Sequence, residues 1–173
     1  MKALVRISLK YGVIAGLIGS VLLVGLYYMD RHPFLIPVFL DFRIILFSVF
    51  IFFTFKEIRD FHQGGIFYFW QGIFSSFIFT ACFAILTSLL IVVFIRIDPA
   101  FLSAYISLSI EQLKSLPPEL IENIGKDVYN RNVGLLPDTN GSALALLYFW
   151  QSFMISLFIS IILSVILRTQ LKS

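Results

Sequence analysis

The amino-acid sequence predicts an all-α integral membrane protein with four transmembrane helices and a short helical extracytoplasmic segment between the third and fourth helices. Two observations support this fold class. Of the 173 residues, 59% are hydrophobic and 13% are charged, whereas soluble domains have roughly 45–50% and 25%. The apolar residues also run on for about 20 positions at a time, which is the length that crosses a bilayer core. We therefore expect residues 1–173 to form a single membrane domain in a lipid bilayer.

Four apolar stretches are long enough to span a bilayer with some tilt. They cover about residues 9–29, 34–55, 68–95 and 143–167. The second stretch is the least regular, because Pro37, Asp41 and Arg43 lie in its first half. We expect its regular helix to start near Asp41, with residues 33–40 lying along the membrane interface.

The N-terminal stretch also has features of a secretory signal, because Lys2, Arg6 and Lys10 lie at its start. However, its apolar part is longer than the roughly 7–15 residues of a typical signal. It ends in the bulky residues Leu-Tyr-Tyr-Met at 26–29 and lacks a small-residue cleavage site. We interpret it as a retained membrane anchor.

Basic residues near the helix ends predict the orientation. They concentrate at the N-terminus, in the loop after the second stretch and at the C-terminus, whereas the opposite short loop offers only Arg31. Because cytoplasmic loops are enriched in Lys and Arg, both termini are expected to face the cytoplasm. The bases are divided among separate segments, so the formal net charge of +3 does not indicate binding to nucleic acid.

Small residues recur at every fourth position in three of the stretches. The three sets are Ser8, Gly12, Gly16 and Ser20; then Gly72, Ser76, Thr80, Ala84 and Ser88; and Ser152, Ser156, Ser160 and Ser164. This spacing forms a stripe along one helix face, and in lipid such a stripe lets a second backbone approach closely. We expect helices one, three and four to pack on one another through these stripes. The second helix has only Ser48 and Thr54, so it should sit peripherally or face a partner. A polar path of serine hydroxyls is the alternative interpretation.

The tetrapeptide Tyr-Phe-Trp-Gln occurs twice, at residues 68–71 and 148–151. Tyr and Trp rings favour the headgroup depth of a membrane, so each copy is interpreted as an interfacial anchor. Related segments of opposite direction are also typical of transporters built from inverted repeats. Neither copy is followed by the helix-breaking pattern of such binding sites, which makes two anchors the simpler interpretation.

Asp41 and Arg43 are charged residues at membrane depth. On a regular helix, side chains two positions apart point away from each other. Each is therefore expected to pair elsewhere, with Asp30, Arg31 or Arg96, or with headgroup water. A proton or ion relay centred on Asp41 is the alternative hypothesis, although no second acid or histidine lies deep in another span to continue it.

The loop after the second stretch carries Glu57, Asp60 and His62. One histidine with two acids lacks the spacing of a known ligand set, so these residues are interpreted as a solvated helix end and no metal is expected. The Gly64-Gly65 pair should end that helix.

The outer segment, about residues 96–142, is expected to contain two amphipathic helices that begin at Pro99 and at Pro117-Pro118. We expect this segment to lie on the membrane surface or over the mouth of the bundle. Docking of a periplasmic partner by the same apolar faces is the alternative hypothesis.

Motifs of enzyme chemistry are absent from the sequence. It has no Gly-rich phosphate loop, nucleophile elbow, HExxH motif or Cys and His cluster. We therefore expect no enzymatic activity and no cofactor. The favoured function is a non-enzymatic component that associates with itself or with another membrane protein. The alternative is a small transporter or ion pathway that uses Asp41 and the serine-rich faces of the third and fourth helices.

Several short motifs resemble one bacterial family. They are Lys10-Tyr11-Gly12, the run Phe55 to Asp60 with Gly64-Gly65, Phe69-Trp70-Gln71-Gly72, Asp98-Pro99 and the closing Arg168. Their layout resembles the family known as domain of unknown function 4199 over nearly the whole chain. The resemblance implies a four-span protein of the bacterial inner membrane, with no established activity or site residues. The family usually has Pro and Gly at the start of the last span, where this chain has Trp150-Gln151-Ser152.

Overall fold

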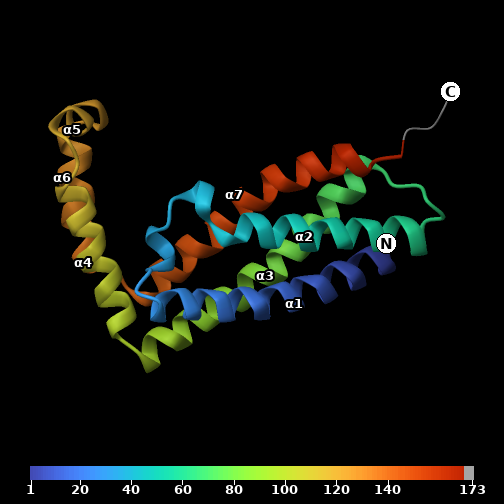
Figure 1. The fold of residues 1–173 in the computed structure, drawn as a ribbon, viewed down its shortest axis with the longest axis horizontal. Helices are drawn as coiled ribbons and strands as arrows, with labels where there is room; N and C mark the ends of the chain where they lie inside the picture. Colours follow the sequence, from blue (N-terminus) through green and yellow to red (C-terminus); the bar gives the residue numbers. More distant parts are fainter. Residues whose placement is uncertain (170–173) are drawn as a thin grey trace.

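The computed structural model describes residues 1–169, and this part of the chain contains helices and no strand (Figure 1). Four long helices are α1 (Lys2–Tyr28), α2 (Phe42–Glu57), α3 (Phe69–Ile97) and α7 (Gly141–Leu167). We call these four the helical body. The shorter helices α4 (Ala100–Lys114), α5 (Pro118–Ile124) and α6 (Lys126–Leu135) form, with the 3₁₀ turn η4 (Leu136–Asp138), a projection that we call the arm. Three further turns are η1 (Pro33–Leu35), η2 (Val38–Leu40) and the π-helical η3 (Ile58–His62).

Three helices, α1, α3 and α7, are long and apolar enough to cross a membrane. The second apolar stretch is different, because α2 has 16 residues and begins only at Phe42. The expectation that its regular helix starts near Asp41 is confirmed, since the 3₁₀ turns η1 and η2 occupy most of residues 33–40. The structure thus supports three of the four expected spans by length and composition.

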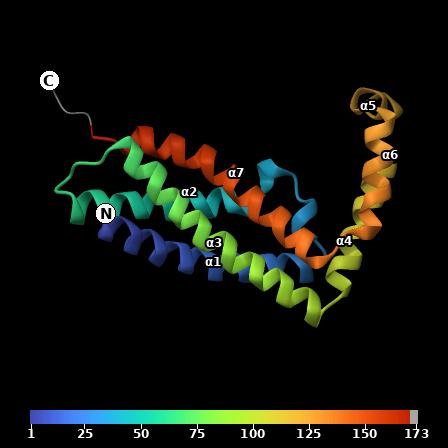
Figure 2. The ribbon, with the colours of Figure 1, turned by 180° about the vertical axis from the view of Figure 1, so that it is seen from behind.

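The helical body is organised around α3, which contacts α1 on one side and α7 on the other. In Figures 1 and 2, α1 and α7 lie on opposite sides of the body, and α2 runs between them. We expected helices one, three and four to pack on one another. This expectation is wrong for the first and last helices, α1 and α7, which do not pack on each other. The starts of α1 and α3 lie near the ends of α2 and α7, so α1 and α3 run in one direction and α2 and α7 run in the opposite direction.

The second helix is not peripheral. Phe47, Ile51 and Phe55 have no exposed surface, and they recur every four residues on the inner face of α2. The Phe47 ring packs edge-to-face on Phe79 and Phe83 of α3, at centroid distances of 5.6 and 4.7 Å. Bulky side chains of α2 thus fill the space between α1 and α7, a role that its lack of small residues did not suggest.

The small-residue stripes of α3 and α7 face each other. A Cβ atom added to Gly72 would collide with the Ser164 hydroxyl. The Thr80 and Ser156 hydroxyls are hydrogen-bonded, and the Ser88 hydroxyl donates to the carbonyl oxygen of Ala145 at 3.0 Å. These contacts bring the two backbones close together along the whole interface.

The stripe of α1 meets a different face of α3. An added Cβ atom at Gly12 would lie 2.8 Å from the carbonyl oxygen of Phe79 and 2.9 Å from the Cβ atom of Cys82. At Gly16 the nearest side chain is that of Leu86. The backbone of Phe79 and the side chains of Cys82 and Leu86 therefore fit against small residues of α1, and the α3 stripe remains available to α7.

The arm leaves the helical body after α3 and points away from it (Figure 1). Phe101 anchors its base, because its ring is fully buried against Tyr27 and Phe94. In contrast, α5 and α6 contain no buried residue. The second amphipathic helix expected here is divided in two at Gly125, whose φ of 94° lies in the region that favours glycine.

Candidate functional site

Asp41 and Arg43 form a buried ion pair at the start of α2. Asp41 is the N-cap residue and has extended backbone angles, φ −65° and ψ 123°. Its carboxylate accepts hydrogen bonds from the backbone N–H and from Nε of Arg43, both at 2.9 Å. The expectation that these side chains point apart is wrong, because Asp41 lies outside the helix and its side chain turns back over the first turn.

The Arg43 guanidinium also joins α2 to α7. Its side chain is 4% exposed, and Nη1 donates to the Ser152 hydroxyl at 3.1 Å. Nη2 donates to Oε1 of Gln151 at 3.0 Å, and the guanidinium carbon lies 4.1 Å from the centroid of the Tyr148 ring. Each guanidinium nitrogen therefore has a partner, as a buried charge requires. Tyr148, Gln151 and Ser152 are i, i+3 and i+4 neighbours, a spacing that places them on one face of α7.

A cavity of about 280 Å³ lies beside this ion pair, between the η1–η2 segment and α7. Asp41, Arg43 and Gln151 provide its polar lining, while residues such as Phe34 and Trp150 provide apolar walls. Both carboxylate oxygens of Asp41 already accept bonds from Arg43. The ion pair therefore has a structural role, and it lies at the edge of a small cavity.

The two Tyr-Phe-Trp-Gln copies have different positions in the fold. Tyr68 is the N-cap of α3, and its backbone N–H donates to Oε1 of Gln71 at 3.0 Å. The second copy lies two turns inside α7, where Tyr148 is buried under Arg43. The anchor interpretation therefore fails for Tyr148, whereas Trp70 and Trp150 are exposed as an interfacial anchor requires.

His32 is buried where the arm meets the helical body. Its Nε2 atom lies 3.1 Å from the carbonyl oxygen of Phe101, and the rings of Tyr27, Phe34 and Tyr105 surround it. Burial lowers the pKa of His32 below its ordinary value of 6.5, although the bond to Phe101 opposes this change. His32 is therefore in its neutral form where it holds the base of the arm. Sequence reasoning assigned it no role, since one histidine among aromatic residues carries no distinctive signal.

The striped positions other than Ser88 are buried at helix contacts, and Ser88 is half-buried. Ser76 and Ser164, at the α3–α7 interface, have hydroxyls without a hydrogen-bond partner in the described chain. The same is true of Ser8 and Ser20 in α1. The stripe hydroxyls thus lie between packed helices, where small size matters more than hydrogen bonding.

The end of α2 and the turn η3 do not bring the candidate metal ligands Glu57, Asp60 and His62 together. Glu57 accepts hydrogen bonds from Lys10 and from the Tyr11 hydroxyl, at 2.7 Å in each case. Burial raises the pKa of Glu57, but the Lys10 and Tyr11 contacts outweigh this effect and hold it below the ordinary value. Asp60 instead pairs with Arg59. Within residues 1–169, no three His, Cys, Asp or Glu side chains lie close enough to hold a metal ion.

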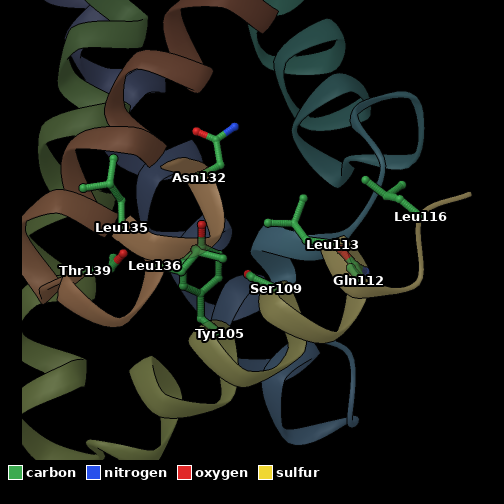
Figure 3. A pocket seen from close by; sticks show the side chains of 9 residues that line it. All are labelled: Tyr105, Ser109, Gln112, Leu113, Leu116, Asn132, Leu135, Leu136 and Thr139. Atoms are coloured by element: carbon green, nitrogen blue, oxygen red, sulfur yellow. The ribbon is translucent and has the colours of Figure 1, made fainter. Parts of the chain in front are cut away.

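The arm contains a cleft of about 500 Å³, which we call the arm cleft. Side chains of α4 and of α6–η4 face each other across it (Figure 3). Its lining residues are Tyr105, Ser109, Gln112, Leu113, Leu116, Asn132, Leu135, Leu136 and Thr139. No Asp, Glu, Lys, Arg or His side chain is among them, and the Ser109 hydroxyl is buried without a hydrogen-bond partner in the described chain. The sequence predicted amphipathic helices here, but not that they would fold back to form a cleft.

We predict that Arg43→Met lowers the free energy of unfolding by about 3–5 kcal/mol, because it leaves the Asp41 carboxylate buried without a partner. Adding Asp41→Asn to this variant should restore most of the loss. Denaturant unfolding of the purified protein in mixed micelles measures both effects. Equal stabilities of Arg43→Met and the double variant would show that the two side chains do not interact.

We also predict that the protein is less stable in mild acid because of His32. The unfolded chain binds a proton on this histidine more readily than the folded chain does, so stability falls as the pH drops below the unfolded-state value of about 6.5. The slope should reach at most about 1.4 kcal/mol per pH unit. Unfolding at pH 8 and pH 5.5 should show this loss in the wild type and in the matched control His62→Gln. A loss that persists in His32→Phe would assign the acid sensitivity to other groups.

The chain was compared with protein-family models, curated proteins and solved structures. No curated protein and no solved structure matches it. One family model, described as "Protein of unknown function (DUF4199)", matches residues 10–169. This range includes α2, α3, α7 and the whole arm, together with α1 from residue 10 onward. The chain therefore belongs to the DUF4199 family of proteins of unknown function.

Proposed function

We propose that this protein is a non-enzymatic accessory component of the bacterial inner membrane, with four spans, that binds another membrane protein through its arm. The observation that carries the proposal is the uncharged arm cleft on a projection away from the helical body. The family assignment is compatible with this role but names no activity.

The fourth span in this proposal is α2 together with the segment before it. Sixteen residues of helix are about 24 Å long, which is shorter than a hydrocarbon core of about 30 Å. The η1–η2 segment supplies the remaining length and exposes Val38, Phe39 and Leu40. Its 3₁₀ turns satisfy part of its backbone, because the N–H groups of Leu35 and Leu40 donate to the carbonyl oxygens of His32 and Pro37.

Four spans would place both chain ends on one side of the membrane. The start of α1 and the end of α2 meet through Lys10 and Glu57, and the backbone N–H of Thr169 donates to the Phe67 carbonyl oxygen at 2.8 Å. This end of the body carries most of the basic residues near helix ends, which favours a cytoplasmic location. The arm would then lie outside the cytoplasm.

The arm cleft suits a segment of another protein that presents both apolar and polar groups. Its four leucines offer apolar contact, while Gln112, Asn132 and the buried Ser109 hydroxyl can bond to polar groups. An amphipathic helix docks into grooves of this kind through a few apolar anchors. The small-residue stripes are used inside the chain, so they offer little surface for self-association. This favours a different protein as the partner.

The test is native mass spectrometry after gentle solubilisation of membranes that contain the tagged protein at its natural level. We expect a second polypeptide at fixed stoichiometry. Leu113→Glu should remove it, because a carboxylate in the arm cleft would have no partner. The matched control Leu120→Glu changes an exposed residue of α5 outside the cleft and should retain it. A bare monomer in the wild type, or equal retention in both variants, would contradict the proposal.

A second candidate function, a small transporter or ion pathway, is favoured by one observation. Arg43 bonds to Ser152, and further serines follow every four residues along α7 to Ser164. Successive positions of such a row are about 5–6 Å apart, so water would have to bridge them. The collision of an added Gly72 Cβ atom with Ser164 shows how little room the α3–α7 interface leaves there.

If the protein is an ion pathway, we predict a proton flux that depends on the Asp41 carboxylate. The double variant Asp41→Asn/Arg43→Met removes that group without leaving one charge unpaired. Proteoliposomes with an internal pH-sensitive dye measure the flux under an imposed pH gradient. If the wild type and the double variant acidify at equal rates, Asp41 does not carry protons.

A further inference from the structure

A second large cavity lies at the end of the helical body opposite the arm. It has a volume of about 610 Å³ and is bounded by α1 on one side and by the last turns of α2 and η3 on the other. The residues that line it are Tyr11, Phe53, Lys56, Glu57, Phe61 and His62. In Figure 1 the N-terminal end of α1 lies beside the end of α2 at this place. Neither the ion pair at Arg43 nor the arm cleft involves any of these residues.

Basic residues lie near this cavity, and Lys56 is one of the residues that line it. Lys2, Arg6 and Lys10 recur every fourth residue, so they lie along one face of α1. The salt bridge from Lys10 to Glu57, at 2.7 Å, places the Lys10 end of this face beside the cavity, because Glu57 lines it. Arg6 and Lys56 have no acidic side chain within 4.0 Å in the described part of the chain. The acids in this region are therefore already neutralised, and the excess charge is positive.

An exposed apolar track leads along α2 into the cavity. Ile45, Val49 and Phe53 are 73%, 44% and 47% exposed, and their four-residue spacing aligns them on the outer face of the helix. The last of the three also lines the cavity. Phe61, in the π turn η3, is 80% exposed at the other edge. An apolar path along the membrane-facing side of α2 thus ends at a group of cations.

We propose that this cavity binds an anionic phospholipid from the surrounding leaflet. Its phosphate would lie between Lys56 and the basic face of α1, and one acyl chain would follow the track from Phe53 to Ile45. Basic residues next to a membrane each contribute about 1 kcal/mol to binding of anionic lipid. The apolar track favours a lipid over a free phosphate, because only the lipid can cover it. The proposal requires the helical body to be embedded in lipid, but it does not depend on the proposed role of the arm.

The experiment is native mass spectrometry of the full chain in detergent, titrated with phosphatidylglycerol or with phosphatidylcholine of identical acyl chains. We expect phosphatidylglycerol to bind more tightly, and more weakly as salt rises. Arg6→Gln combined with Lys56→Gln should weaken phosphatidylglycerol binding by about 25-fold, about fivefold for each charge. The matched control Lys114→Gln/Arg131→Gln removes two arm cations and should leave the affinity unchanged.

Two further measurements test the acyl track and the source of the phosphate. Val49→Ser should weaken phosphatidylglycerol binding, whereas Val93→Ser, on an exposed position of α3, should not. A large excess of inorganic phosphate should fail to displace the bound lipid. Equal binding of the two lipids, an equal effect of the two charge variants, or displacement by inorganic phosphate would each overturn the proposal.

Discussion

The structure depends on the close approach of α3 to the helices on either side of it. Lipid supplies no hydrophobic force between helices, so their association relies on tight van der Waals packing and on interhelical hydrogen bonds. Gly72 against Ser164 and the bonded pair Thr80–Ser156 hold α3 close to α7. On the other side, Gly12 admits the backbone of Phe79. With α1 and α7 fixed around α3, the remaining groove between them is filled by the bulky face of α2.

The buried Arg43 determines how α2 begins. A buried guanidinium needs a counter-charge and further hydrogen-bond partners. Asp41 supplies the charge because it remains in extended conformation as the helix cap, and α7 supplies the other acceptors. This arrangement keeps the η1–η2 segment beside α7, near His32 and the base of the arm. One ion pair therefore connects the helical body to the part of the chain that supports the arm.

The two ends of the molecule differ in chemical character. The arm cleft has an uncharged lining of leucine and small polar side chains, which is suited to contact with protein. The opposite end has a cavity lined by Lys56, with further basic residues on the first turns of α1 and an exposed apolar track that leads to it. These features are suited to contact with lipid. The helical body separates these surfaces, so changes at one end can be tested without altering the other.

Much of the fold could be predicted from local sequence patterns. Uninterrupted apolar stretches gave the three longest helices, and Pro37 with Asp41 indicated the late start of α2. The packing partner of each helix face could not be predicted. A four-residue spacing identifies a stripe of small residues, but it does not identify the residues that pack against that stripe. Thus the α1 stripe meets the Phe79 backbone and the Cys82 and Leu86 side chains of α3, and not the α3 stripe. Arg43 and Asp41 were expected to diverge because helical geometry was assumed for a residue that caps the helix.

The most direct test of this account is a disulfide cross-link across the α3–α7 interface in native membranes. Thr80→Cys and Ser156→Cys are introduced together in a Cys82→Ser background, with the two single-cysteine variants as controls. Because the two native hydroxyls are hydrogen-bonded within one chain, oxidation should give an internal disulfide and a product of monomer mass. A covalent dimer would show that the stripes meet between copies. Two free thiols in a folded chain would show that they do not meet at all, and either result would contradict the account.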